Sequence, residues 1–152
     1  ASDERLRVTM HPVSARGSWS GTSPLAPTPN GPRRAGQHDS DSPAIAAITR
    51  ARVKPRYWRT FARSVPPVST DLHAHAGPIF ALGIGEAPIG LQGTFSLWHN
   101  HADIDAFAYQ RSAHQRAIAQ TAELNWYAEE MFARLTVIAC EGTYRGTTVF
   151  GS

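Results

Sequence analysis

Residues 22–43, TSPLAPTPNGPRRAGQHDSDSP, limit the possible folds more than any other part of the sequence. Five prolines and two glycines lie among these 22 positions, together with several serine, threonine and aspartate residues. Proline fixes φ and has no backbone N–H donor, so this composition is incompatible with a helix or a central strand. A loop of this length is unusual within one compact domain, and we interpret it as a linker between two units.

The part of the chain after this linker alternates between strand-like and helix-like patterns. The strand-like segments are apolar or alternate apolar residues with polar ones, and the helix-like segments repeat apolar residues at helical spacing. The expected strands are residues 43–53, 79–84, 90–98 and 132–140, and the expected helices are residues 57–65 and 101–131, with a break near Asn125. Glu129 and Glu130 then lie at an exposed helix end. This βαββαβ order predicts an α+β fold, with a four-stranded antiparallel sheet and two helices on one of its faces.

A short internal repeat relates the two ends of the chain. Residues 5–8 are strand-like and precede GSWSG at residues 17–21, and residues 134–137 similarly precede GTYRG at residues 142–146. In this alignment the first copy has four additional residues between strand and glycine. Residues 5–10 are expected to add a strand to the sheet or to a partner chain. The predicted units are the last strand of a truncated first repeat (1–21), the linker (22–43), a second repeat (44–146) and a tail (147–152).

The composition limits the class of protein. The single cysteine, Cys140, excludes an intrachain disulfide and favours a cytoplasmic protein, and its apolar neighbours suggest a small buried hydrophobe. The sequence lacks a run of about 18 apolar residues, and its first residues lack a signal-peptide core. The net charge of +3 is spread along the chain without interleaved stacking aromatics, so no nucleic acid is expected as a partner. It is typical of a solvated surface or of weak attraction to an anionic membrane.

Most of the chain outside the linker consists of segments whose order and spacing match one known family. The segments are residues 12–21 (PVSARGSWSG), 48–55 (ITRARVKP), 83–88 (GIGEAP), 94–98 (TFSLW), 107–109 (FAY), 114–118 (HQRAI), 126–134 (WYAEEMFAR) and 141–144 (EGTY). Together they resemble the spheroidene monooxygenases. No single motif is decisive, and their order and spacing carry the resemblance.

The resemblance implies a fold and an activity. The fold would be a pair of ferredoxin-like βαββαβ repeats forming an α+β barrel of the dimeric α/β-barrel type, with most of the first repeat absent from this chain. The activity would be that of a haem-dependent monooxygenase of carotenoid biosynthesis, which uses O₂ and electrons from a reduced ferredoxin to place a keto group at C-2 of an acyclic carotenoid such as spheroidene. A substrate of this kind implies peripheral contact with the inner face of a membrane.

His114 is the candidate ligand of the haem iron. It lies seven residues after Phe107 and four before Ile118, beside the apolar stripe of the expected helix. The position alone favours a partly buried histidine hydrogen-bonded to the backbone, whereas together with the resemblance it predicts an axial haem ligand. The other six histidines are interpreted as surface or capping residues: His11, His38, His73, His75, His99 and His101. The last two have no third ligand at a zinc-like spacing.

Further side chains of the same region are expected to complete the cofactor site. Apolar walls for a porphyrin or a polyene would come from Phe107, Ile118 and Trp126. The haem propionates would pair with Arg111 and Arg116, because a guanidinium matches the geometry of a carboxylate. Each assignment has a simpler alternative, which is core packing for the three apolar side chains and a solvated surface for the two arginines.

Three classes of function remain open on the sequence. The first is the haem-dependent monooxygenase, and the second is a cofactor-free or differently specialised enzyme on the same fold, since a fold does not determine a reaction. The third is an inactive or non-enzymatic fragment that binds haem or lipid. A barrel half without its partner would leave one sheet face uncovered, which predicts a homodimer or an exposed apolar surface.

Overall fold

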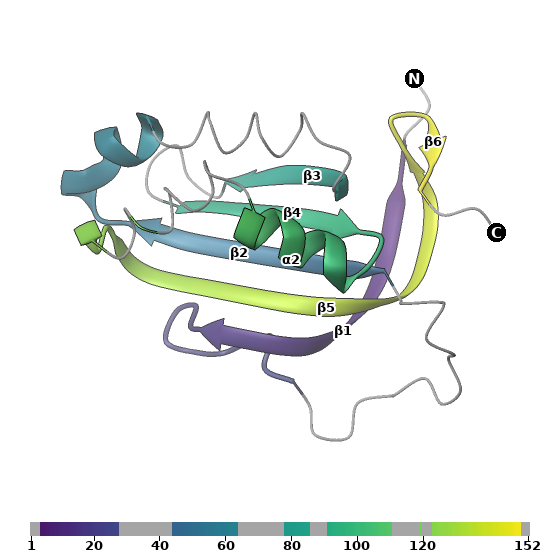
Figure 1. Ribbon diagram of the computed structural model, residues 1–152, viewed down its shortest axis with the longest axis horizontal. Coiled ribbons are helices and arrows are strands. Elements are labelled where there is room, and N and C mark those ends of the chain that lie inside the picture. Colours follow the sequence, from purple (N-terminus) through teal and green to yellow (C-terminus); the bar gives the residue numbers. More distant parts are fainter. Residues whose placement is uncertain are drawn as a thin grey trace.

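The computed structural model describes residues 4–27, 44–63, 78–85, 91–110, 119 and 123–149. These residues form a single six-stranded sheet with helix α2 (His101–Gln110) packed on it (Figure 1). The strands are β1 (Leu6–Gly17), β2 (Ile45–Val53), β3 (Pro78–Gly85), β4 (Leu91–Trp98), β5 (Tyr127–Tyr144) and β6 (Thr147–Thr148). The 3₁₀ turn η1 (Pro55–Tyr57) follows β2 and continues into helical residues 58–63, at the place where the sequence predicts the first helix.

The strand order confirms the predicted fold class. The sheet runs β1-β5-β2-β4-β3, β6 pairs with the end of β5, and every one of these pairings is antiparallel. Within it, β5-β2-β4-β3 is the order of a ferredoxin-like βαββαβ unit, in which the third strand lies between the first and the second. The expected pairing of residues 79–84 with residues 94–98 is also confirmed, as in Gly83 opposite Thr94.

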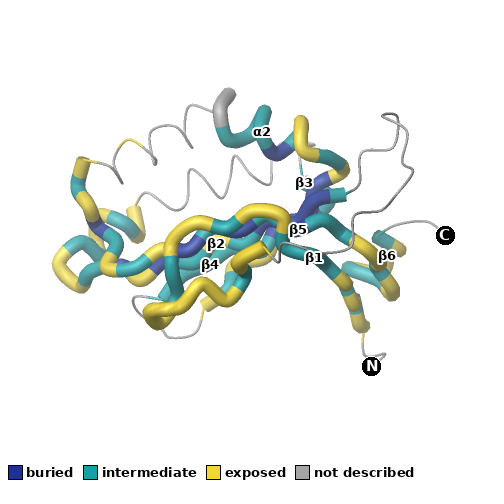
Figure 2. The backbone as a smooth tube through the Cα atoms, turned by 90° about the horizontal axis from the view of Figure 1, so that it is seen from below, coloured by how far each residue is buried: buried dark blue, intermediate teal, exposed yellow. Residues whose placement is uncertain are grey.

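Side chains are buried on both faces of the sheet. Helix α2 covers one face (Figures 1 and 2), where Ala47, Trp98 and Ile104 form a buried cluster. Successive side chains of a strand point to opposite faces, so Ala46 lies on the face away from α2. There it joins a second cluster with Phe80, Leu97, Ala133 and Leu135. Alanines at these central positions leave room for the large side chains of the neighbouring strands.

The C-terminal end of the long helix expected at residues 101–131 is wrong. Helix α2 is described to Gln110, and β5 already begins at Tyr127 instead of at residue 132. The expected break near Asn125 is confirmed, because this residue has a left-handed φ of 44°. Residues 127–131 are good helix formers, but in the structure they pair with β2, and Glu130 lies opposite Ala51. Pairing between distant segments therefore outweighs local helix propensity here.

The two glycine segments of the internal repeat adopt the same turn. Ser20 and Gly21 have φ values of 53° and 73°, and Arg145 and Gly146 have φ values of 52° and 75°. Two successive positive φ values are typical of a type I′ hairpin turn. The alignment of the two strands in the repeat was wrong. Equivalent residues are 125 positions apart throughout, as in Gly17 and Gly142, so the first copy has no additional residues between strand and glycine.

Candidate functional site

Helix α2 carries the predicted site residue Phe107 and holds it against the sheet. The Phe107 ring is 5.4 Å from the ring of Trp98, which is only 2% exposed. The Trp98 indole N–H donates to the Ser96 hydroxyl at 2.9 Å, so its polar atom is satisfied inside the core. Arg134 of β5 reaches Asp105 of α2 at 2.6 Å and ties the helix to the sheet. The result is a fixed aromatic wall beneath α2.

The other predicted cofactor residues have different outcomes. His114, Ile118, Arg111 and Arg116 lie outside the described residues, so their roles stay predictions. Trp126 is 1% exposed and makes an edge-to-face contact with Phe61 at 5.5 Å. Its carbonyl accepts a hydrogen bond from the Lys54 N–H at 2.8 Å. Trp126 therefore packs in the core at the start of β5, as its simpler alternative has it.

Of the described histidines, His99 and His101 agree with their interpretation as surface or capping residues, whereas His11 lies within β1 and is half-buried. His99 and His101 are exposed at the start of α2, and the helix is capped by the neighbouring Asn100, whose side-chain oxygen accepts from the Asp103 N–H at 3.0 Å. His11 is half-buried on β1, opposite Thr136. His38, His73 and His75 lie outside the described residues. Within the described part of the chain, no three His, Cys, Asp or Glu side chains are grouped to hold a metal ion.

A cation–aromatic cluster lies on the face of the sheet away from α2, and the sequence does not predict it. Arg50 places its guanidinium carbon 3.9 Å from the centre of the Trp19 ring, and Arg52 lies 5.7 Å from the same centre. Arg50 and Arg52 share the face of Ala46, because they are two and three residue pairs further along β2. The i, i+2 spacing of two arginines in a predicted strand is the signal that could have shown their common face.

Glu129 completes this cluster and corrects an interpretation. It lies within β5, not at an exposed helix end, and its side chain is only 16% exposed. Its carboxylate is 3.8 Å from the Arg52 guanidinium and accepts the Gly21 N–H at 3.1 Å and the Ser18 hydroxyl at 3.3 Å. Glu129 thereby fastens the first glycine turn, which follows β1, onto β2 and β5.

An apolar strip lies beside this cluster on the same face. Ile48, Phe95 and Leu82 are neighbours across β2, β4 and β3. Ile48 and Phe95 are half-buried, whereas Leu82 is 40% exposed. The central part of this face is thus less covered than the face beneath α2.

None of the helices in the described part of the chain is long and apolar enough to cross a membrane.

Cys140 is partly buried in β5, where burial first and the neighbouring Glu141 carboxylate second raise the pKa of its thiol. Only the thiolate is nucleophilic, so a raised pKa means slower alkylation at neutral pH. We expect iodoacetamide to modify Cys140 more slowly than free cysteine at about pH 8, with the rate still rising above about pH 9. Glu141→Gln should speed the reaction at the lower pH. Mass spectrometry measures the rate of alkylation. A rate equal to that of free cysteine would contradict the raised pKa of the Cys140 thiol.

Curated proteins that are similar to the chain share one name. The chain is 35% identical over 143 residues to a spheroidene monooxygenase of Rhodobacter capsulatus, covering 94% of the chain and 57% of the relative. It is 37% identical to that of Rubrivivax gelatinosus, covering 91% and 50%, and 32% identical to that of Cereibacter sphaeroides, covering 99% and 44%. The chain therefore spans about half the length of the curated relatives that it matches. No family model matches the chain.

Solved structures support the fold without indicating a reaction. A protein from Fusobacterium nucleatum superposes with a TM-score of 0.58 at 15% identity, covering 92% of this chain and 54% of that protein. A protein of unknown function from Nitrosomonas europaea superposes with a TM-score of 0.54 at 14% identity, covering 68% of this chain and 98% of that protein. The Nitrosomonas europaea protein thus corresponds to a part of this chain, whereas the Fusobacterium nucleatum protein is about twice as long as the region that it shares with this chain.

The relatives and the structure agree with each other. The identity of 32–37% extends over at least 91% of the chain, across both the strand before the linker and the unit after it. The sheet order independently identifies a ferredoxin-like unit. The chain belongs to the spheroidene monooxygenase family.

Proposed function

We propose that the chain is part of a haem-dependent monooxygenase that places a keto group at C-2 of an acyclic carotenoid such as spheroidene. The observation that carries this proposal is the identity of 32–37% to three spheroidene monooxygenases over nearly the whole chain. The chain spans about half of these relatives, and the resemblance places it in their C-terminal part. The active protein would therefore include the portion that precedes this part in them. The barrel would be completed by that portion or by a second copy of the chain.

The haem would be held by the region that begins at α2. His114 would hold the haem iron through one imidazole nitrogen, and a hydrogen-bond acceptor would orient the ring through the other nitrogen. Bound haem supplies the activation of O₂, while the protein orients the substrate and excludes water. Phe107 is fixed against Trp98 at 5.4 Å, and such an apolar aromatic wall suits a flat porphyrin or a polyene. Ile118 would extend this wall, and Arg111 would pair with a propionate.

The proposed reaction inserts oxygen twice at one methylene carbon. In each step one atom of O₂ enters a C–H bond and the other leaves as water, with two electrons from reduced ferredoxin and two protons from solvent. The resulting geminal diol loses water and gives the ketone. The carotenoid would enter from a membrane, and the basic balance of the chain, +3, would favour contact with its anionic surface.

The experiment that tests this function uses the chain joined to the preceding portion of the Rhodobacter capsulatus relative. The fusion protein is incubated with spheroidene in detergent micelles, O₂ and reduced ferredoxin, and the products are identified by mass spectrometry. We expect a product with one additional oxygen and two fewer hydrogens, and none without O₂ or without reductant. A folded, haem-loaded fusion that leaves spheroidene unchanged would support the non-enzymatic alternative instead.

A further inference from the structure

The face of the sheet on which α2 packs is open at one position in the middle of β2. Ala47, Thr49 and Ala51 share this face, because side chains alternate along a strand. Ala47 and Ala51 are buried, whereas Thr49 between them is exposed. Thr49 is opposite Phe132 of β5 and Thr94 of β4, and both of these residues are half-buried. The covering of this face is therefore interrupted along the row of Phe132, Thr49 and Thr94.

Two arginines lie against the aromatic residue of this open row. Arg16 of β1 is opposite Phe132, and its guanidinium carbon is 5.3 Å from the centre of the Phe132 ring. Arg134 follows Phe132 by two residues on β5 and so shares its face, and its guanidinium carbon is 5.9 Å from the same centre. Attraction between a cation and the face of an aromatic ring holds both side chains in place. One half-buried ring therefore brings two guanidinium groups together beside the open row.

The carboxylates near these two arginines leave donors for a ligand. Asp105 of α2 accepts from one terminal nitrogen of Arg134 at 2.6 Å, whereas a guanidinium has five N–H donors. Arg16 is exposed and belongs to none of the ion pairs within the described part of the chain. Glu130 lies on the same face, two residues before Phe132, and its exposed carboxylate belongs to none of these ion pairs either. Both guanidinium groups can therefore donate to a further carboxylate.

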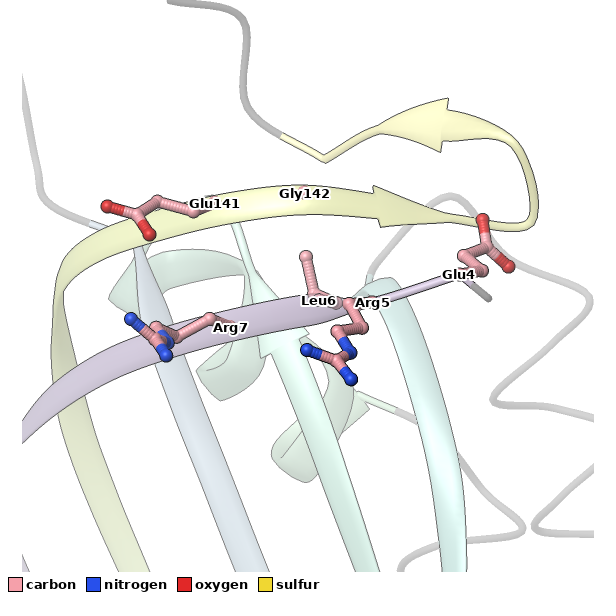
Figure 3. A pocket seen from close by; sticks show the side chains of 6 residues that line it. All are labelled: Glu4, Arg5, Leu6, Arg7, Glu141 and Gly142. Atoms are coloured by element: carbon pink, nitrogen blue, oxygen red, sulfur yellow. The ribbon is translucent and has the colours of Figure 1, made fainter. Parts of the chain in front are cut away.

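A second pair of arginines, at the other end of β1, lies in a different setting. A hollow of about 640 Å³ there is lined by Glu4, Arg5, Leu6, Arg7, Glu141 and Gly142 (Figure 3). In Figure 3, Arg5 and Arg7 project from one side of the strand and Leu6 from the other. Among the described residues that line this hollow, two are glutamates and none is aromatic. It therefore offers no ring on which a flat apolar ligand could stack, and its arginines serve as a comparison for Arg16 and Arg134.

We propose that the open row is a porphyrin site in which Arg16 and Arg134 bind one carboxylate of the macrocycle. A guanidinium binds a carboxylate through two parallel hydrogen bonds, and a half-buried aromatic ring suits the apolar body of a flat ligand. This set of donors fits a propionate of haem. The site borders α2 through the contact between Arg134 and Asp105, and Gln110 of α2 is four residues before His114. The inference rests on the proposed haem dependence and adds two residues that hold the group.

Protoporphyrin IX tests the two arginines without the iron. It has the flat ring and the two carboxylates of haem and no metal for a histidine to hold. The chain is titrated with protoporphyrin IX, and the porphyrin fluorescence gives the Kd. We expect Arg134→Gln to weaken binding by about 10-fold or more, because a charge-assisted hydrogen bond is lost. Arg16→Gln should weaken it by about 3-fold or more, since an ion pair of an exposed side chain contributes less.

Matched controls separate recognition of a carboxylate from support of the fold. The dimethyl ester of protoporphyrin IX has no free carboxylate, so the unmodified chain and both arginine variants should bind it equally. Asp105→Asn breaks the same contact to α2 but keeps the Arg134 guanidinium, so it should bind protoporphyrin IX at least as tightly as the unmodified chain does. Arg7→Gln removes an exposed arginine from the other end of β1 and should leave the Kd unchanged. His114→Ala should also leave this Kd unchanged, whereas it should weaken the binding of haem.

Two results would overturn the porphyrin site. The first is an unmodified chain that does not bind protoporphyrin IX, or binds it no more tightly than the Arg16→Gln variant does; this variant decides the question if Arg134→Gln does not fold. The second is a loss of binding in Asp105→Asn as large as that in Arg134→Gln, which would show that Arg134 acts only by holding α2. The proposed function fails separately: if the arginine variants weaken protoporphyrin IX but haem gives no Soret band with the chain, the porphyrin site is supported and haem dependence is wrong.

Discussion

Gly17→Ala is expected to lower the free energy of unfolding by roughly 3 kcal/mol, a large part of the stability of a small domain. A Cβ atom at position 17 would lie 2.1 Å from the Glu130 carbonyl oxygen, and the φ of 78° is itself unfavourable for alanine. The clash has no easy relief, because Glu130 belongs to β5 and is also paired with Ala51 of β2 on its other side. Denaturant unfolding followed by circular dichroism measures the change.

The control variants separate the clash from the backbone conformation. Gly21→Ala has a φ of 73° but no atom near the new Cβ, so a cost of about 1 kcal/mol is expected. Gly83→Ala, in open space on β3, should change stability by no more than about 0.5 kcal/mol. Gly142→Ala meets the carbonyl of Arg5, which directly precedes β1. β1 is paired with β5 alone among the described strands, so it can yield more easily and the substitution should cost less than Gly17→Ala. Equal stability of the Gly17 and Gly83 variants would contradict the close approach of β1 and β5.

His114→Ala is expected to remove the Soret absorption of bound haem and to reduce carotenoid oxidation to background. If His114 holds the iron as proposed, the variant would lack the protein ligand that sets the position and electronic properties of the iron. The measurement uses the fusion with the preceding portion of the Rhodobacter capsulatus relative, with absorption spectra recorded before the turnover assay. Circular dichroism confirms that the variant is folded.

His101→Ala is the matched control, because His101 is a histidine exposed at the start of α2, thirteen residues before His114 in the sequence. It should keep the spectrum and the activity of the unmodified protein. The assignment of His114 as the ligand would be wrong if the His114 variant kept a normal Soret band while the His101 variant lost it. Loss of haem in both variants would point to a disturbed helix and not to a ligand.

The sheet could be predicted from the sequence because its signals are local. β2, β3 and β4 are short segments that are apolar or alternate apolar with polar residues, near proline or glycine, and the structure places them where the pattern predicts. The start of β5 could not be predicted, because residues 127–131 are helix formers and become a strand only through pairing with β2. The sequence alignment of the internal repeat matched the two strands four residues out of register for a similar reason, since only the β1–β5 pairing fixes the register.

The candidate site divides in the same way. Phe107 could be predicted as an apolar residue facing inward, because its position in the helical pattern is local information. The cluster of Trp19, Arg50 and Glu129 could not, since these residues are brought together by a turn, a strand and a second strand far apart in the sequence. His114 rests on the family resemblance, which the relatives support at the level of the family but not of the residue.

The most direct test of the central claim is complementation in a carotenoid-producing bacterium that lacks its own spheroidene monooxygenase and accumulates spheroidene. The strain receives either the fusion of this chain with the preceding portion of the Rhodobacter capsulatus relative or its His114→Ala variant, and its pigments are separated by chromatography and weighed by mass spectrometry. We expect the fusion to convert spheroidene into its C-2 ketone and the variant to leave it unchanged. Unchanged spheroidene in cells that contain the folded fusion protein would contradict it.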